Sequence, residues 1–135
     1  MLAVTDEPLD VAEHETAVGG PRAGAVVSFA GVVRDHDHGR GVLRLDYEGH
    51  PSAEAVLREV AEEIAADPEV LAVAVSHRIG ALEIGDVALA AAVATAHRAA
   101  AFDACARLVD RVKERLPVWK HQVFTDGTDE WVNCP

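Results

Sequence analysis

Apolar residues recur at two spacings along the chain, and the shorter spacing predicts strands. Residues 24–33 form a mostly apolar run rich in valine, which is typical of a buried strand. Apolar and polar residues alternate over 43–48, which predicts a strand with one exposed face. A further apolar run covers 70–75. The alternation over 87–93 favours one more strand, although its alanine content leaves a helix as the alternative.

Three helices are predicted, from an apolar spacing of three to four residues and from residues that are typical of helix starts and stops. A short helix is expected over residues 7–17. A second helix begins at Pro51. Its apolar face carries Val56, Leu57, Val60 and Ile64. The longest helix spans about residues 96–116 and ends at Pro117, because the residue before a proline avoids helical geometry.

The end of the chain has the pattern of a β-hairpin, with strands at 118–124 and 130–132 around an Asp126-Gly127 turn. The polar segment 35–41 is expected to be a loop between two earlier strands. Strands interspersed with three helices predict an α+β fold with a mixed or antiparallel sheet and one long helix. A chain of 135 residues suffices for one hydrophobic core, so a single domain is expected over residues 1–135.

The predicted long helix carries cations on two faces. A wheel with 100° per residue places one apolar stripe along it, made of Phe102, Cys105, Val109, Val112 and Leu116. On the opposite, solvated face lie Arg107, Arg111 and Arg115. Arg98 and Lys113 instead lie on or beside the apolar stripe. A cation that faces the core is costly unless it is paired or functional, although a structural salt bridge is the ordinary explanation for each.

Lysine is rare in this chain and occurs only at positions 113 and 120, in an acidic protein that otherwise uses arginine for positive charge. A lysine can lose its proton in a buried site and act as a base or nucleophile, whereas an arginine cannot. Lys113 and Lys120 are therefore candidate catalytic residues. The alternative is that Lys113 only favours a helix C-terminus and that Lys120 is a solvated strand residue.

The predicted start of the long helix also carries cations. His97 and Arg98 follow Thr95, the expected N-cap, and cations at this end oppose the helix dipole. A bound anion would remove the conflict, because free backbone N–H groups and both side chains would converge on it. We therefore predict half of a phosphate or carboxylate site here, the alternative being a His-Arg pair neutralised by acidic neighbours. Arg34, at the end of the first buried strand, is a further candidate, since strand ends commonly form sites.

These two groups of candidate residues lie at opposite ends of one helix. His97 and Lys113 are 16 residues apart, which corresponds to roughly 24 Å in a helix. They cannot contact one small ligand within the same chain. Either they serve different sites, or a two-fold homodimer brings the helix start of one chain to the helix end of the other and completes each pocket.

The charge and cysteine content narrow the possible partners and compartments. The net charge of −11 argues against nucleic acid or an anionic membrane as the main partner. No leader segment is expected, and the sequence contains no uncharged apolar run near 20 residues, the length that a membrane-spanning helix needs. Two cysteines do not form a disulfide framework, so a cytoplasmic protein is expected.

The sequence gives only weak support for a metal site, a cysteine nucleophile or a common catalytic or nucleotide-binding motif. The Asp35-His36-Asp37-His38 segment has metal-type ligands, but all lie in one short loop, so a polar loop is favoured and no metal site is expected. Cys105 is expected to be a small buried hydrophobe. Cys134 has no basic neighbour in sequence and is not predicted to be a nucleophile. No Ser-His-Asp signature, P-loop or dinucleotide-binding glycine motif is present.

A family resemblance is carried by motifs spread over most of the chain. They are Gly24–Arg34, Ser76–Gly80, Ala96–Phe102 and Val112–Lys120, followed by Asp126-Gly127 and Trp131-Val132. With these motifs in this order, the chain resembles the catalytic (large) subunit of molybdopterin synthase from about Gly24 to Val132. The resemblance implies an α/β hammerhead-type fold.

The resemblance also implies a reaction and partners. Enzymes of this family are sulfurtransferases of molybdenum cofactor biosynthesis, which convert a cyclic pyranopterin monophosphate into the dithiolene molybdopterin. The sulfur comes from the C-terminal thiocarboxylate of a small ubiquitin-like subunit that ends in Gly-Gly. Two large subunits form the central homodimer of a heterotetramer, and the tail of each small subunit enters a pocket of a large subunit. No cofactor and no metal are expected.

The site residues implied by the resemblance form two sets. The lysines near the thiocarboxylate are implied to be catalytic, and they are Lys113 and Lys120. The substrate-binding residues are implied to be Val32, Val33, Arg34, His97, Arg98, His121 and Gln122. Within this second set, His97 and Arg98 match an anion-binding pair that the partner protomer contributes.

Two other readings of the sequence stay open. A non-catalytic dimeric binding module for an anionic metabolite would keep Arg34, His97 and Arg98 but would not need both lysines. A metal-binding or structural protein would instead depend on the loop with His36 and His38.

Overall fold

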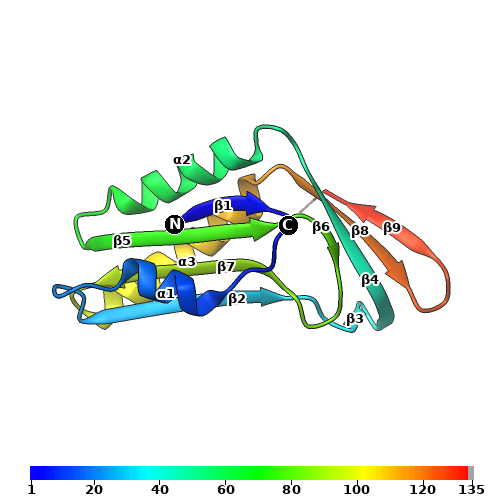
Figure 1. Ribbon diagram of the computed structural model, residues 1–135, viewed down its shortest axis with the longest axis horizontal. Coiled ribbons are helices and arrows are strands. Elements are labelled where there is room, and N and C mark those ends of the chain that lie inside the picture. The colour runs from blue at the N-terminus through cyan, green and yellow to red at the C-terminus, as the bar shows by residue number, and fades with distance from the viewer. Residues whose placement is uncertain (134–135) are drawn as a thin grey trace.

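The larger part of the fold is built on a four-stranded sheet (Figure 1). The computed structural model describes residues 1–133, so the prediction for Cys134 lies outside the described residues. The strand order in this sheet is β1 (Leu2–Thr5), β5 (Val70–Arg78), β7 (Val87–Thr95) and β2 (Ala25–Val32). Strand β1 is parallel to β5 and the other neighbours are antiparallel, which confirms the prediction of a mixed sheet.

A second, antiparallel sheet lies at one end of the first (Figure 1). Its strand order is β3 (His36–Asp37), β4 (Arg40–Gly49), β8 (Val118–Phe124) and β9 (Asp129–Val132), and β6 (Gly80–Leu82) also pairs with β4. Strands β8 and β9 confirm the predicted hairpin. Gly127 in its turn has a φ of 87°, a value that glycine adopts without strain.

The sequence pattern did not reveal the three shortest strands. Strands β1, β3 and β6 contain four, two and three residues. Strands this short hold too few residues for an alternation of apolar and polar positions, and they form because longer neighbours offer free backbone groups. The segment 35–41, predicted to be a loop, therefore contains β3 and the turn into β4.

Three helices cover the first sheet: α1 (Val11–Val18), α2 (Ala53–Ala65) and α3 (Arg98–Arg115). Helix α1 begins later than the predicted start at residue 7. Asp10 is its N-cap, and the Asp10 side chain accepts a hydrogen bond from the Ala12 N–H at 2.8 Å. Among the described residues, no helix combines the length and the apolar character needed to cross a bilayer.

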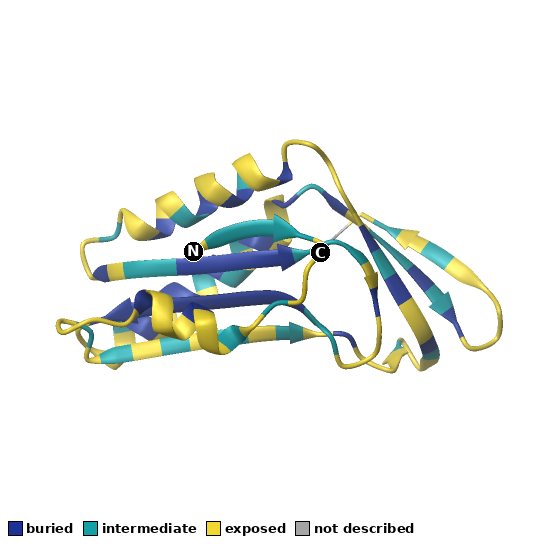
Figure 2. Cartoon of the chain, in the orientation of Figure 1, coloured by how far each residue is buried: buried dark blue, intermediate teal, exposed yellow. Residues whose placement is uncertain are grey.

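Strand β7 is buried on both faces, which explains its alanine-rich composition (Figure 2). Ala91 and Val93 belong to the core cluster that also contains residues of α2 and α3. Ala92 and Ala94 point to the other face and pack with Val18 of α1. Small side chains on both faces allow helices to pack closely against the strand. The strand prediction for 87–93 is confirmed, and the helical alternative is wrong.

The long helix is confirmed, but its predicted orientation is partly wrong. Phe102 is 62% exposed, whereas the buried residues of α3 are Ala101, Ala104, Cys105, Leu108 and Val112. The helix turns its alanines towards β2 and β7, and this rotates Phe102 outwards. Arg98 and Lys113, which were predicted to lie on or beside the apolar stripe, are both exposed. Thr95 ends β7, and the N-cap of α3 is His97, not Thr95.

Two arginines predicted to lie on the solvated face of α3 form ion pairs with acidic residues in or just after α2. Arg107 is paired with Asp67 at 2.8 Å, just beyond the end of α2. Arg115 is paired with Glu59 and Glu63 of α2. Each arginine side chain is about one third exposed, so each pair stabilises the contact only modestly.

Candidate functional site

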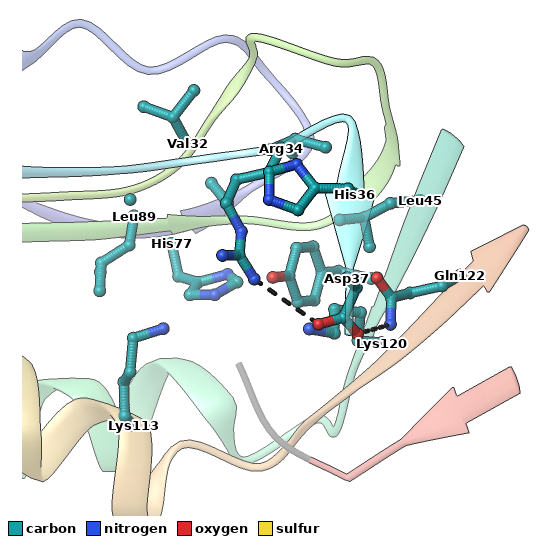
Figure 3. A pocket seen from close by; sticks show the side chains of 14 residues that line it. Val32, Arg34, His36, Asp37, Leu45, His77, Leu89, Lys113, Lys120 and Gln122 are labelled. Carbon is teal, nitrogen blue, oxygen red and sulfur yellow. Dashed lines mark hydrogen bonds and ion pairs between the residues drawn. The ribbon is translucent and has the colours of Figure 1, made fainter. Parts of the chain in front are cut away.

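A pocket of about 280 Å³ opens where the two sheets meet (Figure 3). Its walls come from the end of β2 and the residues after it, from β4, β5, β7 and β8, and from the last turn of α3. Six of the predicted site residues line this pocket: Val32, Val33, Arg34, Lys113, Lys120 and Gln122. Segments that are far apart in sequence therefore converge on one cavity.

An irregularity at the end of β2 places Arg34 at the pocket. The register between β2 and β7 shifts between Gly31 and Val32, and such bulges redirect the side chains that follow. Val33 is buried, with 5% of its surface exposed. The Arg34 side chain is 65% exposed, and its Nη2 lies 3.5 Å from Oδ1 of Asp37. Arg34 is thus a partly solvated cation whose side chain has room to turn towards a ligand.

The two lysines reach the pocket from different elements. Lys113 lies in the last turn of α3, and Figure 3 shows its side chain extending towards His77. Lys120 lies in β8, in register with Tyr47 of β4. Side chains two positions apart on a strand share a face, so Gln122 follows Lys120 into the pocket. The arrangement adds two ammonium groups to the guanidinium of Arg34.

His121 lies on the other face of β8 and does not line the pocket. Its ring stacks on Trp131, with centroids 4.5 Å apart and planes 10° apart. Its Nε2 lies 2.7 Å from a carboxylate oxygen of Asp129. The alternation of side chains along a strand separates His121 from its neighbours Lys120 and Gln122.

Gln122 holds the Asp37 carboxylate inside this cationic pocket. The Gln122 amide donates hydrogen bonds to Asp37 at 2.8 Å and to Glu130 at 3.0 Å, and Gln122 is 3% exposed. The hydrogen bond from Gln122 is the main cause that lowers the pKa of the Asp37 carboxyl group. Nearby basic side chains lower this pKa further, and partial burial opposes them. Asp37 is therefore a fixed negative charge at the site.

His77 is a pocket residue that the sequence analysis did not select. It is 1% exposed, and its Nδ1–H donates to the carbonyl oxygen of Arg78 at 2.7 Å, which leaves the lone pair on Nε2. The ring meets Tyr47 edge-on, with centroids 4.9 Å apart. The pKa of His77 is lowered to about 4, mainly by burial and to a lesser degree by the charge of Lys113. The available signal was a histidine at the end of an otherwise apolar strand.

His97 and Arg98 lie at the opposite end of α3 from Lys113 and do not line the pocket. Both residues are exposed, and His97 makes no side-chain capping hydrogen bond. One chain therefore does not bring the two groups of candidate residues together. That a second copy supplies His97 and Arg98 stays a prediction.

The acidic and histidine-rich loop after β2 does not form a metal centre in the described part of the chain. Within residues 1–133, no cluster of three or more His, Cys, Asp or Glu side chains is arranged to hold a metal ion. His36 is hydrogen-bonded to Asp35 at 2.8 Å, and His36 and Asp37 both line the pocket.

The fold and the pocket together define an α+β protein with a small cavity whose arginine and two lysines suit an anionic ligand. The family model described as MoaE protein matches residues 4–115. This match covers most of the chain, and the chain belongs to the MoaE protein family.

Individual relatives and a solved structure extend the match to nearly the whole chain. The chain is 42% identical to molybdopterin synthase catalytic subunit 1 of Mycobacterium tuberculosis, across 96% of this chain and 88% of the relative. It is 40% identical to the molybdopterin synthase catalytic subunit of Halalkalibacterium halodurans, across 97% and 84%. The crystal structure of molybdopterin synthase from Staphylococcus aureus matches with a TM-score of 0.86 and 32% identity, across 97% of this chain and 94% of that chain.

Proposed function

We propose that this chain is the catalytic subunit of a molybdopterin synthase, a sulfurtransferase that acts on cyclic pyranopterin monophosphate. The sulfur donor is the thiocarboxylate at the Gly-Gly end of a small ubiquitin-like subunit, and the product is the dithiolene molybdopterin. Identities of 40% and 42% to relatives with this name support the proposal. The observation that carries it is the pocket in which Arg34, Lys113 and Lys120 meet.

Recognition of the substrate phosphate is assigned to Arg34. A guanidinium group forms charge-assisted hydrogen bonds with phosphate oxygens. The present contact of Arg34 with Asp37 is long, at 3.5 Å, and the Arg34 side chain is mostly exposed, so little stability is lost when Arg34 turns to a ligand. In the proposed homodimer, Arg98 of the second protomer adds positive charge to the same phosphate, and His97 of that protomer adds a hydrogen-bonding side chain.

Sulfur transfer is assigned to the two lysines. The thiocarboxylate sulfur attacks a carbon of the pterin side chain, and an oxygen substituent of that carbon leaves as water. A second water then adds to the resulting thioester carbonyl and breaks its carbon–sulfur bond, so that the sulfur stays on the pterin and the small subunit departs with a C-terminal carboxylate. Lys113 and Lys120 orient the thiocarboxylate, stabilise the developing negative charge and move protons. The neighbouring His77 is compatible with a catalytic Lys113. An imidazole with a pKa of about 4 is neutral at pH 7, so His77 adds no second cation beside the lysine.

Reconstitution is the direct test of this function. The purified chain is mixed with a thiocarboxylated Gly-Gly partner and the cyclic pyranopterin, and the dithiolene product is measured. The matched control uses the same partner with an ordinary C-terminal carboxylate, which has no sulfur to give. Product formation with the first partner alone is the expected result. Substrate binding without any product would favour the non-catalytic binding module instead.

A further inference from the structure

Asp37 differs in charge from the other ionisable residues around the pocket. Of the described residues that line the pocket, it is the one acidic residue, among Arg34, Lys113 and Lys120. Its Oδ1 lies 3.5 Å from Arg34, and its side chain is 18% exposed. Figure 3 shows the carboxylate between Arg34 and Gln122, with a dashed line to each.

The Asp37 carboxylate has an anchor that does not depend on Arg34. Gln122 donates to it at 2.8 Å from a position on β8 that is 3% exposed. Gln122 is held in turn by a second hydrogen bond, to Glu130 at 3.0 Å. When Arg34 turns to a ligand, Asp37 therefore stays in place. Any anion bound beside Arg34 then lies near a fixed negative charge.

We propose that Asp37 is a specificity-determining residue that makes the pocket favour a singly charged phosphodiester over a doubly charged phosphomonoester. A phosphodiester carries one negative charge, whereas a monoester carries nearly two above its second pKa of about 6. The repulsion from a fixed carboxylate grows in proportion to the charge of the ligand. Asp37 thus weakens the binding of a monoester more than that of a diester.

This inference rests on the proposed function and adds a ring-opening step, in which the cyclic phosphodiester of the substrate becomes a phosphomonoester. Water adds its oxygen to phosphorus, the ring oxygen leaves as a hydroxyl group, and the new phosphate oxygen loses a proton. The ligand thereby gains one negative charge while it is bound. Asp37 then disfavours the product relative to the substrate, which promotes product release without any movement of the protein.

The test compares two variants that remove one negative charge from the same loop. Asp37→Asn keeps an oxygen that accepts from Gln122 but removes the charge in the pocket. Asp35→Asn is the matched control, because the Asp35 side chain is 78% exposed, is bonded to His36 and does not line the pocket. Dissociation constants are measured by NMR titration at pH 8 with the full chain. The probes are glycerol 1,2-cyclic phosphate, a diester, and glycerol 1-phosphate, a monoester.

The expected result is a change in selectivity that is confined to Asp37→Asn. Its affinity for the monoester rises about tenfold more than its affinity for the diester, and Asp35→Asn changes both by less than about twofold. Asp37→Ser, which removes the charge with a shorter side chain, is expected to show the same gain, so that the result does not depend on the folding of a single variant.

Two results would overturn the inference and leave the proposed function intact. One is an equal change for both probes in Asp37→Asn, and the other is the same selectivity change in Asp35→Asn, which would reflect net charge alone. If the wild-type chain binds neither probe, the result counts against the phosphate site itself, and therefore against the proposed function as well.

Discussion

At the scale of single residues, the pocket combines a lysine with a histidine that stays neutral. Lys113 and His77 line the same cavity, and the ammonium charge of Lys113 contributes to the low pKa of His77. The hydrogen bond from His77 to the Arg78 carbonyl fixes which ring nitrogen carries the proton. Two predictions belong to this pair.

The first prediction concerns catalysis by Lys113. Lys113→Ala is expected to lower the rate of sulfur transfer by about 100-fold or more, because the variant loses a group that moves protons and stabilises charge, while substrate binding survives. Arg111→Ala is the control, since it removes a cation from the same part of α3 but not from the pocket. Single-turnover rates and binding titrations are compared. Transfer near the wild-type rate in Lys113→Ala would show that Lys113 is not catalytic.

The second prediction concerns the pH dependence of stability through His77. Its pKa falls from 6.5 to about 4 on folding, so between these values the unfolded chain binds a proton that the folded chain does not. Stability is therefore lost as the pH falls from about 6.5 towards 4, and this residue accounts for roughly 2 to 3 kcal/mol of the loss between pH 7 and 4.5.

Urea unfolding of the wild type and of His77→Gln at pH 7 and 4.5 checks this contribution. The variant is expected to lose less stability on acidification than the wild type, by that same amount. An identical loss in both proteins would mean that His77 keeps an ordinary pKa in the folded state.

At the scale of elements, the close contact between β2 and the end of β7 depends on a glycine. Gly24 donates its N–H to the Thr95 carbonyl at 3.0 Å, and a Cβ added at Gly24 would lie 2.2 Å from the carbonyl oxygen of Ala96. That oxygen belongs to the backbone and cannot rotate away. Strand β2 ends at the pocket, so its pairing with β7 also positions Arg34.

The third prediction uses this contact. Gly24→Ala is expected to destabilise the protein by about 1 to 3 kcal/mol, because the backbone must shift to accept the methyl group. Gly20→Ala is the control, since nothing lies within 4 Å of a Cβ there, and its effect is expected within about 0.5 kcal/mol. Urea unfolding at pH 7 measures both. Equal stabilities of the two variants would contradict the predicted clash.

At the scale of the whole molecule, the pocket of one chain contains only part of the predicted site. His97 and Arg98 are exposed at one end of α3, and Lys113 lines the pocket at the other end. A two-fold dimer that places the helix start of one chain near the pocket of the other would join them. This arrangement stays a prediction, and complementation between variants tests it.

The fourth prediction is that mixed dimers recover activity. Chains with Lys113→Ala and chains with His97→Ala are each expected to be nearly inactive, whereas an equal mixture after subunit exchange recovers about a quarter of the wild-type activity. Half of the dimers are then mixed, and each mixed dimer has one of its two sites intact. Subunit exchange is verified with differently tagged chains. If exchange occurs and activity stays absent, the two residues do not share a site across chains.

Local periodicity was sufficient to predict the long elements of this protein. The positions of α2, α3, β5, β7 and the β8–β9 hairpin could be predicted because the apolar spacing repeats several times within each segment. The spacing did not predict correctly which face of α3 is buried, since it assigned Phe102 to the core. In the folded protein the alanines of α3 face the sheet instead, because their small side chains allow the helix to approach it.

The sequence alone determined which residue types are unusual: two lysines, an arginine at a strand end and a His-Arg pair at a helix start. Only the tertiary structure decided that Lys113, Lys120 and Arg34 share one pocket with His77 and Asp37. It also decided that His121 lies on the opposite face of β8. The physical reason is that periodicity records the environment of each residue within its own element, whereas a pocket forms where elements distant in sequence pack together.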